Sequence, residues 1–261
     1  MIEIQNLYKS FGALTVLDGV SFDIPDGDTI CIIGKSGSGK SVLLKHIVGL
    51  LSPDQGRVMV DGLQIDTLTF KKIFNLRKQM GFVFQGAALF DSLNVFENVT
   101  LGMYELGNRD MIELEKEAIR VLSAVQLLPD INDVGELSFQ IEWTILKNKK
   151  PSDLSGGMRK RVGVARALVG HPKYIFYDEP TTGLDPVTSE QIDALIANLT
   201  KNLDVTSVVI THDIFSVFQY ARTVAMLHEG KLRYFGNVKG FRDSEDAVVQ
   251  EFIDRFIRNL Y

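Results

Sequence analysis

Short stretches in which apolar and polar residues alternate open the chain. Ile2 and Ile4 form one such stretch, and Val20, Phe22 and Ile24 form the next. Turn-forming residues, Pro25-Asp26-Gly27-Asp28, follow the second stretch. Alternation with a period of two is typical of strands that bury one face. We therefore expect half-buried strands at the start of the chain.

Compact apolar runs then replace the alternation. DTICIIG (28–34), YIFYDEP (174–180) and SVVITHD (207–213) read as fully buried strands, and GRVMVDG (56–62) reads as a further strand between glycines. Helical spacing of apolar residues falls at 41–51 and 189–203. Strands that alternate with helices predict an α/β core with a mainly parallel sheet.

The middle of the chain, from about 87 to 169, has mostly helical spacing, which is clearest at 113–128. After this helix, FQIEWTIL (139–146) alternates well enough to predict a strand. The C-terminal residues 241–261 predict an amphipathic helix whose apolar face is Val248, Val249, Phe252, Ile253, Phe256, Ile257 and Leu260.

Composition and charge narrow the class of protein. The 261 residues are 45% hydrophobic and carry a formal net charge of −5, which argues against a sequence-independent nucleic-acid binder. Cys31 is the single cysteine, so no intramolecular disulfide forms and a reducing compartment fits. The N-terminus lacks the apolar core of a signal peptide, and no apolar run is long enough to span a membrane.

A glycine-rich loop carries the most specific motif. Gly34-Lys35-Ser36-Gly37-Ser38-Gly39-Lys40-Ser41 fits G-x-x-x-x-G-K-[ST] and lies between a predicted buried strand and a helix. In this context the glycines let backbone N–H groups surround phosphates. Lys40 reaches the β- and γ-phosphates, and Ser41 supplies a hydroxyl to Mg²⁺.

Polar residues stand where further predicted strands end. Asp178 and Glu179 end one strand, which suits Asp178 to Mg²⁺ and Glu179 to the deprotonation of an attacking water. His212 and Gln85 end two others, and both are candidates to contact the γ-phosphate, Gln85 also the metal. ATP hydrolysis requires such groups, because its catalysis is mainly positioning and charge stabilisation.

The phosphate loop, Gln85, LSGG (154–157), Asp178-Glu179, GLD (183–185) and His212 occur in this order. Together they resemble the ATP-binding subunit of an ABC (ATP-binding cassette) transporter. The resemblance covers about residues 2–235. It implies a phosphate-loop ATPase core with an N-terminal antiparallel β subdomain and an inserted α-helical subdomain. It also implies a single domain, 1–240. The ATPase core with the β subdomain is expected at 1–86 and 165–240, and the helical subdomain at 87–164, with an unusual insertion at about 131–150.

The resemblance also assigns roles to residues. Phe11 matches the aromatic that stacks on adenine, Val16 lies beside it, and the ATP-binding set continues from Gly34 through Val42. Ser155, Gly156 and Gly157 match the signature loop, which caps ATP held by the opposite protomer. Asp185 matches the D-loop residue, and His212 the switch histidine. Glu179, His212, Gln85 and Lys40 form the implied catalytic set, and Ser41, Gln85 and Asp178 the implied Mg²⁺ ligands.

Partners and substrate follow from the same resemblance. It implies a homodimer that binds ATP and Mg²⁺ and drives membrane permease subunits in separate chains, at the cytoplasmic face of a prokaryotic inner membrane. LSGGMRKRVGVARAL (154–168) most resembles ATPases of MCE-type lipid transporters, which implies an MCE-domain lipid-binding partner. A polar-solute importer, for example of amino acids, is the alternative, and a soluble ABC switch protein a further one.

Three segments keep two interpretations each. Residues 86–99 form either a groove for a partner's helix or a core face. The insertion is either a surface elaboration or a contact to the membrane partner or a lipid surface, aided by Lys147, Lys149 and Lys150. The C-terminal helix packs either on its own domain or on the other protomer. We expect Arg159, Lys160 and Arg161 to be solvated or to face a partner.

Overall fold

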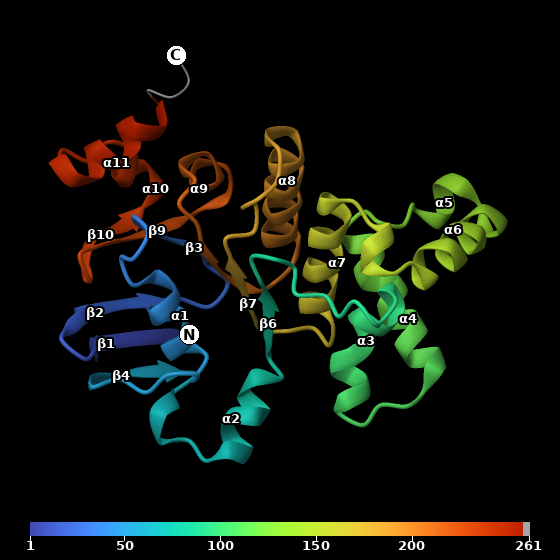
Figure 1. Cartoon of the computed structure of the whole chain (residues 1–261), viewed down its shortest axis with the longest axis horizontal. Coiled ribbons are helices and arrows are strands. Elements are labelled where there is room, and N and C mark those ends of the chain that lie inside the picture. Colours follow the sequence, from blue (N-terminus) through green and yellow to red (C-terminus); the bar gives the residue numbers. More distant parts are fainter. Residues whose placement is uncertain (258–261) are drawn as a thin grey trace. The chain divides into compact units, whose positions relative to one another are not determined.

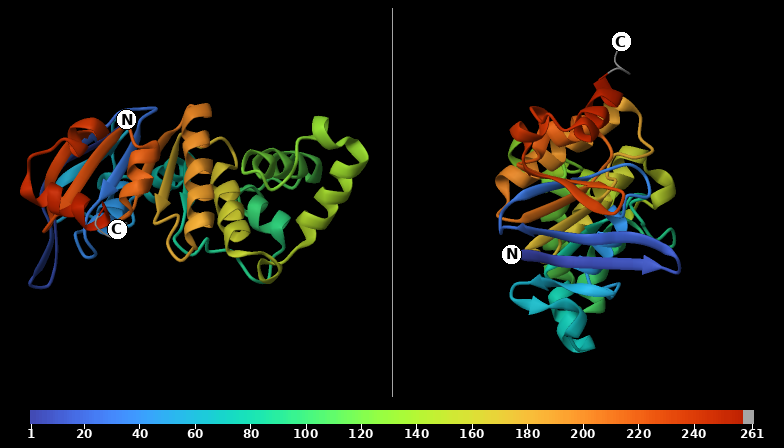
Figure 2. Two further views of the ribbon diagram at one scale, coloured as in Figure 1. Left: turned by 90° about the horizontal axis from the view of Figure 1, so that it is seen from above. Right: turned by 90° about the vertical axis from the view of Figure 1, so that its left-hand side faces the viewer.

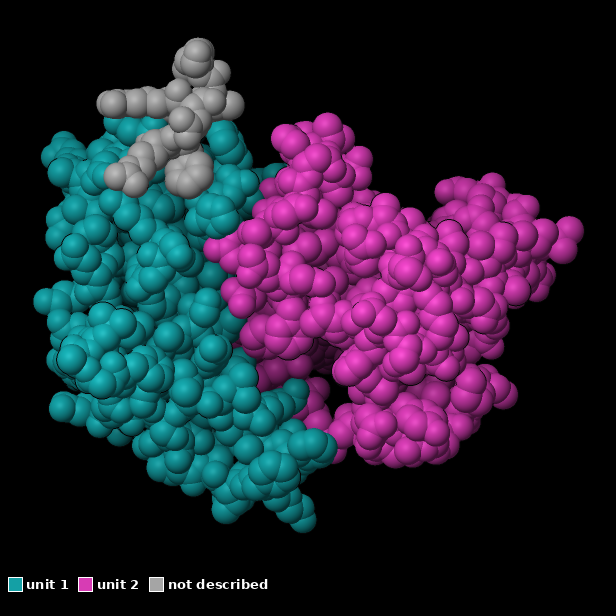
Figure 3. Space-filling model, in the orientation of Figure 1, with its two compact units in different colours: residues 1–77, 203–261 teal, residues 78–202 magenta. Residues whose placement is uncertain are grey.

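The computed structural model describes residues 1–257, with side-chain surroundings through Asp254. The described chain divides into two compact units, shown in different colours in Figure 3. Unit 1 combines Met1–Arg77 with the chain from Leu203 onward, and unit 2 is Lys78–Asn202. Each unit is therefore described by itself below.

An antiparallel sheet forms the first layer of unit 1. Its strand order is β2 (Leu14–Ile24), β1 (Ile2–Phe11), β4 (Gln55–Val60) and β5 (Leu63–Gln64). The long strands β1 and β2 are the blue arrows of Figure 2. Ile2 and Ile4 are at most 1% exposed, as their alternation predicted. The expected N-terminal antiparallel sheet is confirmed.

The second sheet of unit 1 is mainly parallel. β3 (Thr29–Ile33) lies between β8 (Thr206–Ile210) and β9 (Thr223–His228) and runs parallel to both. β10 (Lys231–Asn237) pairs antiparallel with β9. All residues of β3 and β8 are buried, which explains their continuous apolar runs.

Short helices accompany these sheets in unit 1. They are α1 (Lys40–Ile47), α2 (Phe70–Arg77), α9 (Ile214–Tyr220), α10 (Val238–Arg242), α11 (Ala247–Ile257) and the 3₁₀ turn Ile65–Thr67. Helix α1 ends before the expected position 51, because Gly49 adopts a φ of 69°. The helix expected within 241–261 is present as α11, and the separate helix α10 ends at Arg242 before it. Of its predicted apolar face, the side chains of Phe256 and Ile257 and all of Leu260 lie outside the described residues.

Unit 2 combines a parallel strand pair with helices. β6 (Met80–Val83) pairs with β7 (Tyr174–Asp178), and α7 (Gly156–Leu168) packs on β6. The other helices are α3 (Val95–Glu105), α4 (Met111–Ala124), α5 (Ile131–Val134), α6 (Glu136–Asn148), α8 (Pro186–Asn202) and the 3₁₀ turn Pro151–Asp153 (Figure 1). The helical character expected for 87–169 is confirmed.

The predicted strand at 139–146 is wrong, because these residues form helix α6. Phe139, Trp143 and Leu146 recur at helical spacing and are at most 5% exposed. Leu137, Ile141 and Ile145 lie on the opposite face and are at least 54% exposed. A helix that is apolar on two faces imitates the alternation of a strand.

Candidate phosphate site and signature helix

The phosphate loop connects β3 to α1 inside unit 1. Gly34, Gly37 and Gly39 adopt φ values of 151°, 80° and 101°, in which a side chain is strained. A Cβ on Gly34 would lie 2.3 Å from the Leu227 carbonyl oxygen. The sequence therefore needs glycine here, because the Leu227 backbone and the Ser38 side chain lie close to Gly34.

The start of α1 is prepared for an anion. Gly39 is the N-cap, no side chain caps the helix, and its first turn holds no acidic residue. The first N–H groups of the helix are thus available to an anionic ligand, and the helix dipole favours one there. The buried Ser38 hydroxyl oxygen has no hydrogen-bond partner among the described residues. These features fit the phosphates of a nucleotide.

Lys40 lies across this loop. Its ammonium group donates hydrogen bonds to the carbonyl oxygens of Gly34, at 2.8 Å, and of Lys35, at 3.1 Å. The side chain is 8% exposed, so its charge acts at close range on whatever the loop binds. Ser41, the next residue, is exposed.

Two residues are expected near the base, Val16 and Phe11. A Cβ on Gly39 would lie 2.8 Å from the Val16 carbonyl oxygen, so Val16 and the loop are neighbours. Phe11 ends β1, is 48% exposed and has the Lys9 ammonium 5.6 Å from its ring centroid. An exposed aromatic ring leaves a face on which a base can stack.

His212 shares a sheet edge with the phosphate loop. Ile32 of β3 is paired with Ile210 of β8, and the strands are parallel. Gly34 and His212 each follow this pair by two residues, so both stand at the carboxyl edge of the sheet, where ligands bind in such folds. His212 is exposed, and Asp213 after it caps α9.

The corresponding edge of unit 2 gathers the carboxylates and Gln85. Val83 of β6 is paired with Tyr177 of β7. Gln85 and Glu179 each follow this pair by two residues, and Asp178 ends β7 itself. Glu179 has a φ of 50°, which is uncommon for a side-chain-bearing residue, and its Oε2 accepts a hydrogen bond from the Thr182 hydroxyl at 3.0 Å.

The signature residues begin helix α7. The Ser155 Oγ accepts a hydrogen bond from the Met158 N–H at 3.2 Å, so Ser155 is the N-cap of α7. The first turn of α7 contains no acidic residue. A Cβ on Gly157 would lie 2.8 Å from the Thr188 Cγ2, which places α7 against the start of α8.

Thr188 also connects the signature to Asp185. The Asp185 carboxylate accepts hydrogen bonds from the Thr188 hydroxyl, at 2.6 Å, and from the Thr188 N–H, at 3.0 Å. These bonds hold the pKa of Asp185 below its usual value. The structure therefore brings Gly157 and Asp185 together through one threonine.

Within the basic run after the signature, Lys160 is not solvated, contrary to the expectation above, whereas Arg159 is exposed as expected. Lys160 is 5% exposed, and its ammonium group donates to the Gln85 carbonyl oxygen. Arg161 donates to the Val125 carbonyl oxygen at 2.7 Å, and Arg159 to that of Leu154 at 2.5 Å. Burial lowers the pKa of Lys160, and the Glu179 carboxylate opposes this shift.

A second basic side chain holds the same loop. Arg166 donates to the carbonyl oxygens of Ala87, at 2.8 Å, and Ala88, at 2.7 Å. Both alanines have positive φ values, 61° and 47°. The loop after Gln85 is therefore fixed to the signature helix by Lys160 and Arg166. Helical spacing offered a signal for Lys160, since Val164 and Ala167 lie four and seven residues later on the same buried face.

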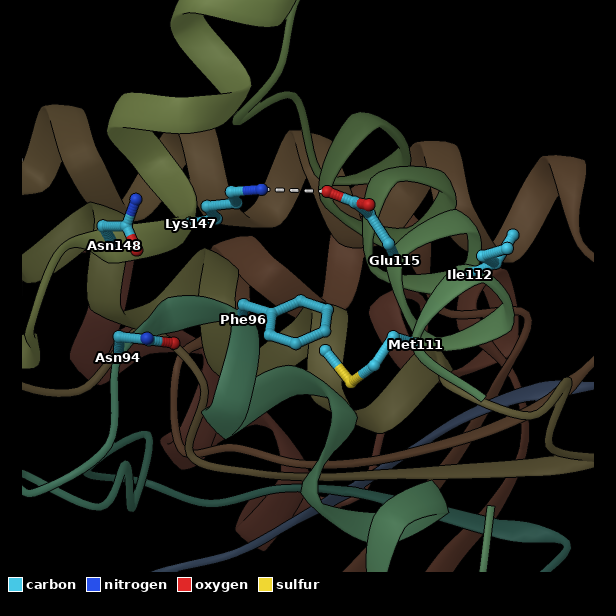
Figure 4. Close-up of a pocket in the computed structure, with 7 residues that line it drawn as sticks. All are labelled: Asn94, Phe96, Met111, Ile112, Glu115, Lys147 and Asn148. Atoms are coloured by element: carbon cyan, nitrogen blue, oxygen red, sulfur yellow. Dashed lines mark hydrogen bonds and ion pairs between the residues drawn. The ribbon is translucent and has the colours of Figure 1, made fainter. Parts of the chain in front are cut away.

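The expected coupling segment is not all core. Phe90 is 54% exposed, whereas Val95 and Val99 are buried. Beside it, a pocket of about 230 Å³ opens between α3, α4 and α6 (Figure 4). Its lining residues are Asn94, Phe96, Met111, Ile112, Glu115, Lys147 and Asn148.

One carboxylate joins α4 to α6 at this pocket. Glu115 accepts hydrogen bonds from the Trp143 indole N–H, at 2.7 Å, and from the Lys147 ammonium, at 2.9 Å. These bonds lower the pKa of Glu115. Trp143 is 1% exposed and meets Phe96 edge-on, with 6.2 Å between ring centroids. The insertion is thus packed firmly on α3 and α4.

No helix within residues 1–257 is both long and apolar enough to cross a bilayer.

Known proteins resemble this chain over nearly its whole length. It is 34% identical to the probable ribonucleotide transport ATP-binding protein mkl of Mycobacterium leprae, over 97% of this chain and 68% of that protein. It is 37% identical to the methionine import ATP-binding protein MetN of Carboxydothermus hydrogenoformans, over 98% of this chain and 72% of that protein. It is 35% identical to the chloroplastic protein TRIGALACTOSYLDIACYLGLYCEROL 3 of Arabidopsis thaliana, over 97% of this chain and 73% of that protein.

The fold and a family model agree with these relatives. The dimeric structure of a post-hydrolysis state of the ATP-binding cassette MJ0796, bound to ADP and Pi, superposes with a TM-score of 0.76 at 31% identity, over 91% of this chain and 99% of that one. The ABC transporter family model matches residues 17–182, which include the phosphate loop, the signature and the Asp178-Glu179 pair. This chain therefore belongs to the ABC transporter family, as an ATP-binding subunit with ATPase activity.

Proposed function

We propose that this chain hydrolyses ATP between its phosphate loop and the signature loop of a second copy, and so drives lipid transport by separate membrane subunits. The observation that carries this proposal is the phosphate loop itself. Its strained glycines, its buried lysine and the uncapped start of α1 are features that recognise a polyphosphate.

Residue roles within this proposal follow the family pattern. Lys40 and the loop N–H groups bind the phosphates, and Phe11 and Val16 contact the base. Ser41, Gln85 and Asp178 are the proposed Mg²⁺ ligands, and hydroxyl, amide and carboxylate oxygens suit that ion. Mg²⁺ supplies charge stabilisation of the phosphates. Glu179 deprotonates the attacking water, and His212 contacts the γ-phosphate.

The signature loop is the half-site for the other protomer's nucleotide. Its helix start lacks acidic residues, and the basic side chains that follow it, Arg159, Lys160 and Arg161, donate to carbonyl oxygens instead. Backbone N–H groups and the helix dipole are then what meets the phosphates. The dimeric state of the MJ0796 structure supports this arrangement.

Replacing Ser155 tests the composite site. Ser155→Arg places a bulky side chain where the opposite nucleotide would lie. We expect ATP binding to the monomer within about twofold of wild type and ATPase activity lost, by about a hundredfold if the cap stabilises the transition state as such donors do. Activity equal to wild type would contradict the composite site.

The proposed substrate is a lipid, moved with an MCE-domain partner. The signature segment 154–168 supports this through its resemblance to MCE-type ATPases, and the Arabidopsis relative carries a galactolipid in its name. A second candidate is amino-acid import, favoured by the 37% identity to a methionine import protein. The mycobacterial relative's name refers to ribonucleotides instead.

The helical face of unit 2 is our proposed contact to the membrane subunit. Residues 94–148 contain ten acidic and four basic side chains, a net charge of −6, whereas the whole chain carries −5. Cytoplasmic loops of membrane proteins are rich in lysine and arginine, so a basic helix complements this surface. Exposed Phe90, Met111 and Ile112 offer it apolar contacts. The proposed location is accordingly the cytoplasmic face of the inner membrane.

Purification of the chain with its native membrane partners, followed by mass spectrometry of proteins and lipids, tests the substrate class. Lipid transport predicts an MCE-domain protein and bound phospholipid in the complex. A periplasmic solute-binding protein in their place would contradict it and favour import.

A further inference from the structure

Helix α11 has a fixed place on unit 1. Val249, Phe252 and Ile253 are at most 4% exposed. Asp246, just before the helix, forms an ion pair with Arg233 of β10 at 2.5 Å and accepts the N–H groups of Val248 and Val249. In Figure 1, α11 lies with α10 beside β10. The helix therefore packs on its own unit, one of the two interpretations that the sequence left open.

From this place α11 reaches the phosphate loop. The Glu251 Oε1 lies 3.3 Å from the Lys35 Nζ, although 216 positions separate the two residues in the sequence. Lys35 directly follows Gly34, and its carbonyl oxygen accepts a hydrogen bond from the Lys40 ammonium. The same residue thus supports Lys40 through its backbone and contacts α11 through its side chain.

A carboxylate at this position opposes the binding of an anion. The phosphate loop recognises negative charge, and Glu251 places a competing negative charge on one of its two lysines. A nucleoside triphosphate carries several negative charges, so it attracts the Lys35 ammonium more strongly than a single carboxylate does. Both side chains of the pair are partly exposed, 40% for Lys35 and 48% for Glu251, so the effect is modest and sensitive to salt.

We infer that Glu251 on α11 is an affinity determinant of the phosphate loop: it lowers the affinity for nucleotide by holding Lys35 in an ion pair. Because binding linkage is reciprocal, bound nucleotide weakens the contact between α11 and the loop. This inference rests on the proposed role of the loop as the nucleotide site.

A double-mutant cycle tests the inference on the full chain. The measured quantity is the Kd of a non-hydrolysable ATP analogue with Mg²⁺ at low ionic strength, by calorimetry. We expect Glu251→Gln to bind about two- to fivefold more tightly than wild type, the range of an exposed ion pair. We expect Glu251→Gln to change the Kd little in a Lys35→Gln background, because the contested ammonium is gone.

Three controls make each outcome decisive. Glu245→Gln removes the same charge from an exposed position before α11 and should leave the Kd unchanged. Equal tightening by Glu251→Gln and Glu245→Gln would overturn the inference. So would additive effects of Glu251→Gln and Lys35→Gln, or an unchanged Kd in Glu251→Gln. An unchanged melting temperature of Glu251→Gln shows that α11 is intact. Lys40→Ala should abolish binding; if the wild-type chain itself binds no analogue, the proposed function fails and not only the role of Glu251.

Discussion

Lys160 shows, at the scale of single residues, how a charged side chain serves the site without meeting the nucleotide. It is buried on α7 and donates to the Gln85 carbonyl oxygen, and the negative charge of Glu179 raises its pKa against the effect of burial. A buried ammonium costs free energy unless it is bonded, so the position is maintained by these contacts. Lys160 therefore positions the loop that carries Gln85.

Removal of this ammonium should slow turnover more than it weakens binding. Lys160→Met keeps the length of the side chain but releases the Gln85 carbonyl oxygen. Loss of a charge-assisted hydrogen bond is worth about 1.5–3 kcal/mol, so we expect kcat to fall at least about tenfold while the Kd for ATP stays within about twofold. Steady-state ATPase assays and calorimetry measure the two quantities.

Lys201→Met is the matched control, since Lys201 is an exposed lysine of α8 in the same unit. Its kcat should equal that of wild type. A Lys160→Met protein that retains full kcat would show that the bond to the Gln85 loop has no part in catalysis.

The sequence predicts individual residues well where a motif fixes the backbone. Gly34 to Ser41 form the expected loop and helix start after β3, because glycine stands where the backbone needs positive φ values that other residues rarely adopt. Lys160 was assigned wrongly because charge suggests a solvated position, whereas its helical spacing with Val164 indicated burial. The contact between Lys35 and Glu251 joins residues far apart in the chain, and no local pattern indicates it.

At the scale of elements, helix α6 shows why the sequence pattern alone predicted the wrong secondary structure. Its two apolar faces produced the appearance of a strand, and only packing on α3 and α4 selects the helix. Glu115 completes this packing by accepting from both Trp143 and Lys147. Tertiary contacts therefore decide the secondary structure where the pattern serves two periods.

Truncation of Trp143 should release α6. Trp143→Ala removes a side chain that is 1% exposed, the edge-on contact with Phe96 and the hydrogen bond to Glu115. We expect a loss of about 3–5 kcal/mol in the free energy of unfolding of this region. Urea denaturation followed by circular dichroism, with limited proteolysis across 136–148, measures it.

Ile145→Ala is the internal comparison, because Ile145 lies on the same helix but is 56% exposed. Its effect should stay within about 0.5 kcal/mol. If both variants lost equal stability, α6 would not be held by the Trp143 face. Nucleotide binding by the phosphate loop should persist in both, since that loop belongs to unit 1.

The motifs divide between the two units at the scale of the whole molecule. The phosphate loop and His212 belong to unit 1, and Gln85, Ser155, Asp178, Glu179 and Asp185 belong to unit 2. The alternation of strands and helices predicted the α/β class, and the order of the motifs predicted the family and the antiparallel first sheet. The expected division into an ATPase core and a helical subdomain, with boundaries near residues 86 and 165, stays a prediction. The compact units follow other boundaries, because β6, β7 and α8 group with the helices of unit 2.

Substrate and partner belong to the assembly and not to the fold of one chain. The strongly acidic helical face, with its pocket and exposed apolar residues, is where the chain differs from an ordinary solvated surface. The partner helix proposed for this face belongs to a second protein, so no pattern within this sequence names that protein.

Turnover by a Glu179→Gln variant tests the central claim most directly. The amide cannot take a proton from the attacking water, but it keeps the shape of the side chain. Because a general base contributes about 10²–10⁴-fold, we expect kcat to fall at least about a hundredfold while Mg²⁺-ATP binds as in wild type and holds a stable dimer, detected by mass measurement in solution. Hydrolysis by Glu179→Gln at a rate near wild type would contradict the account.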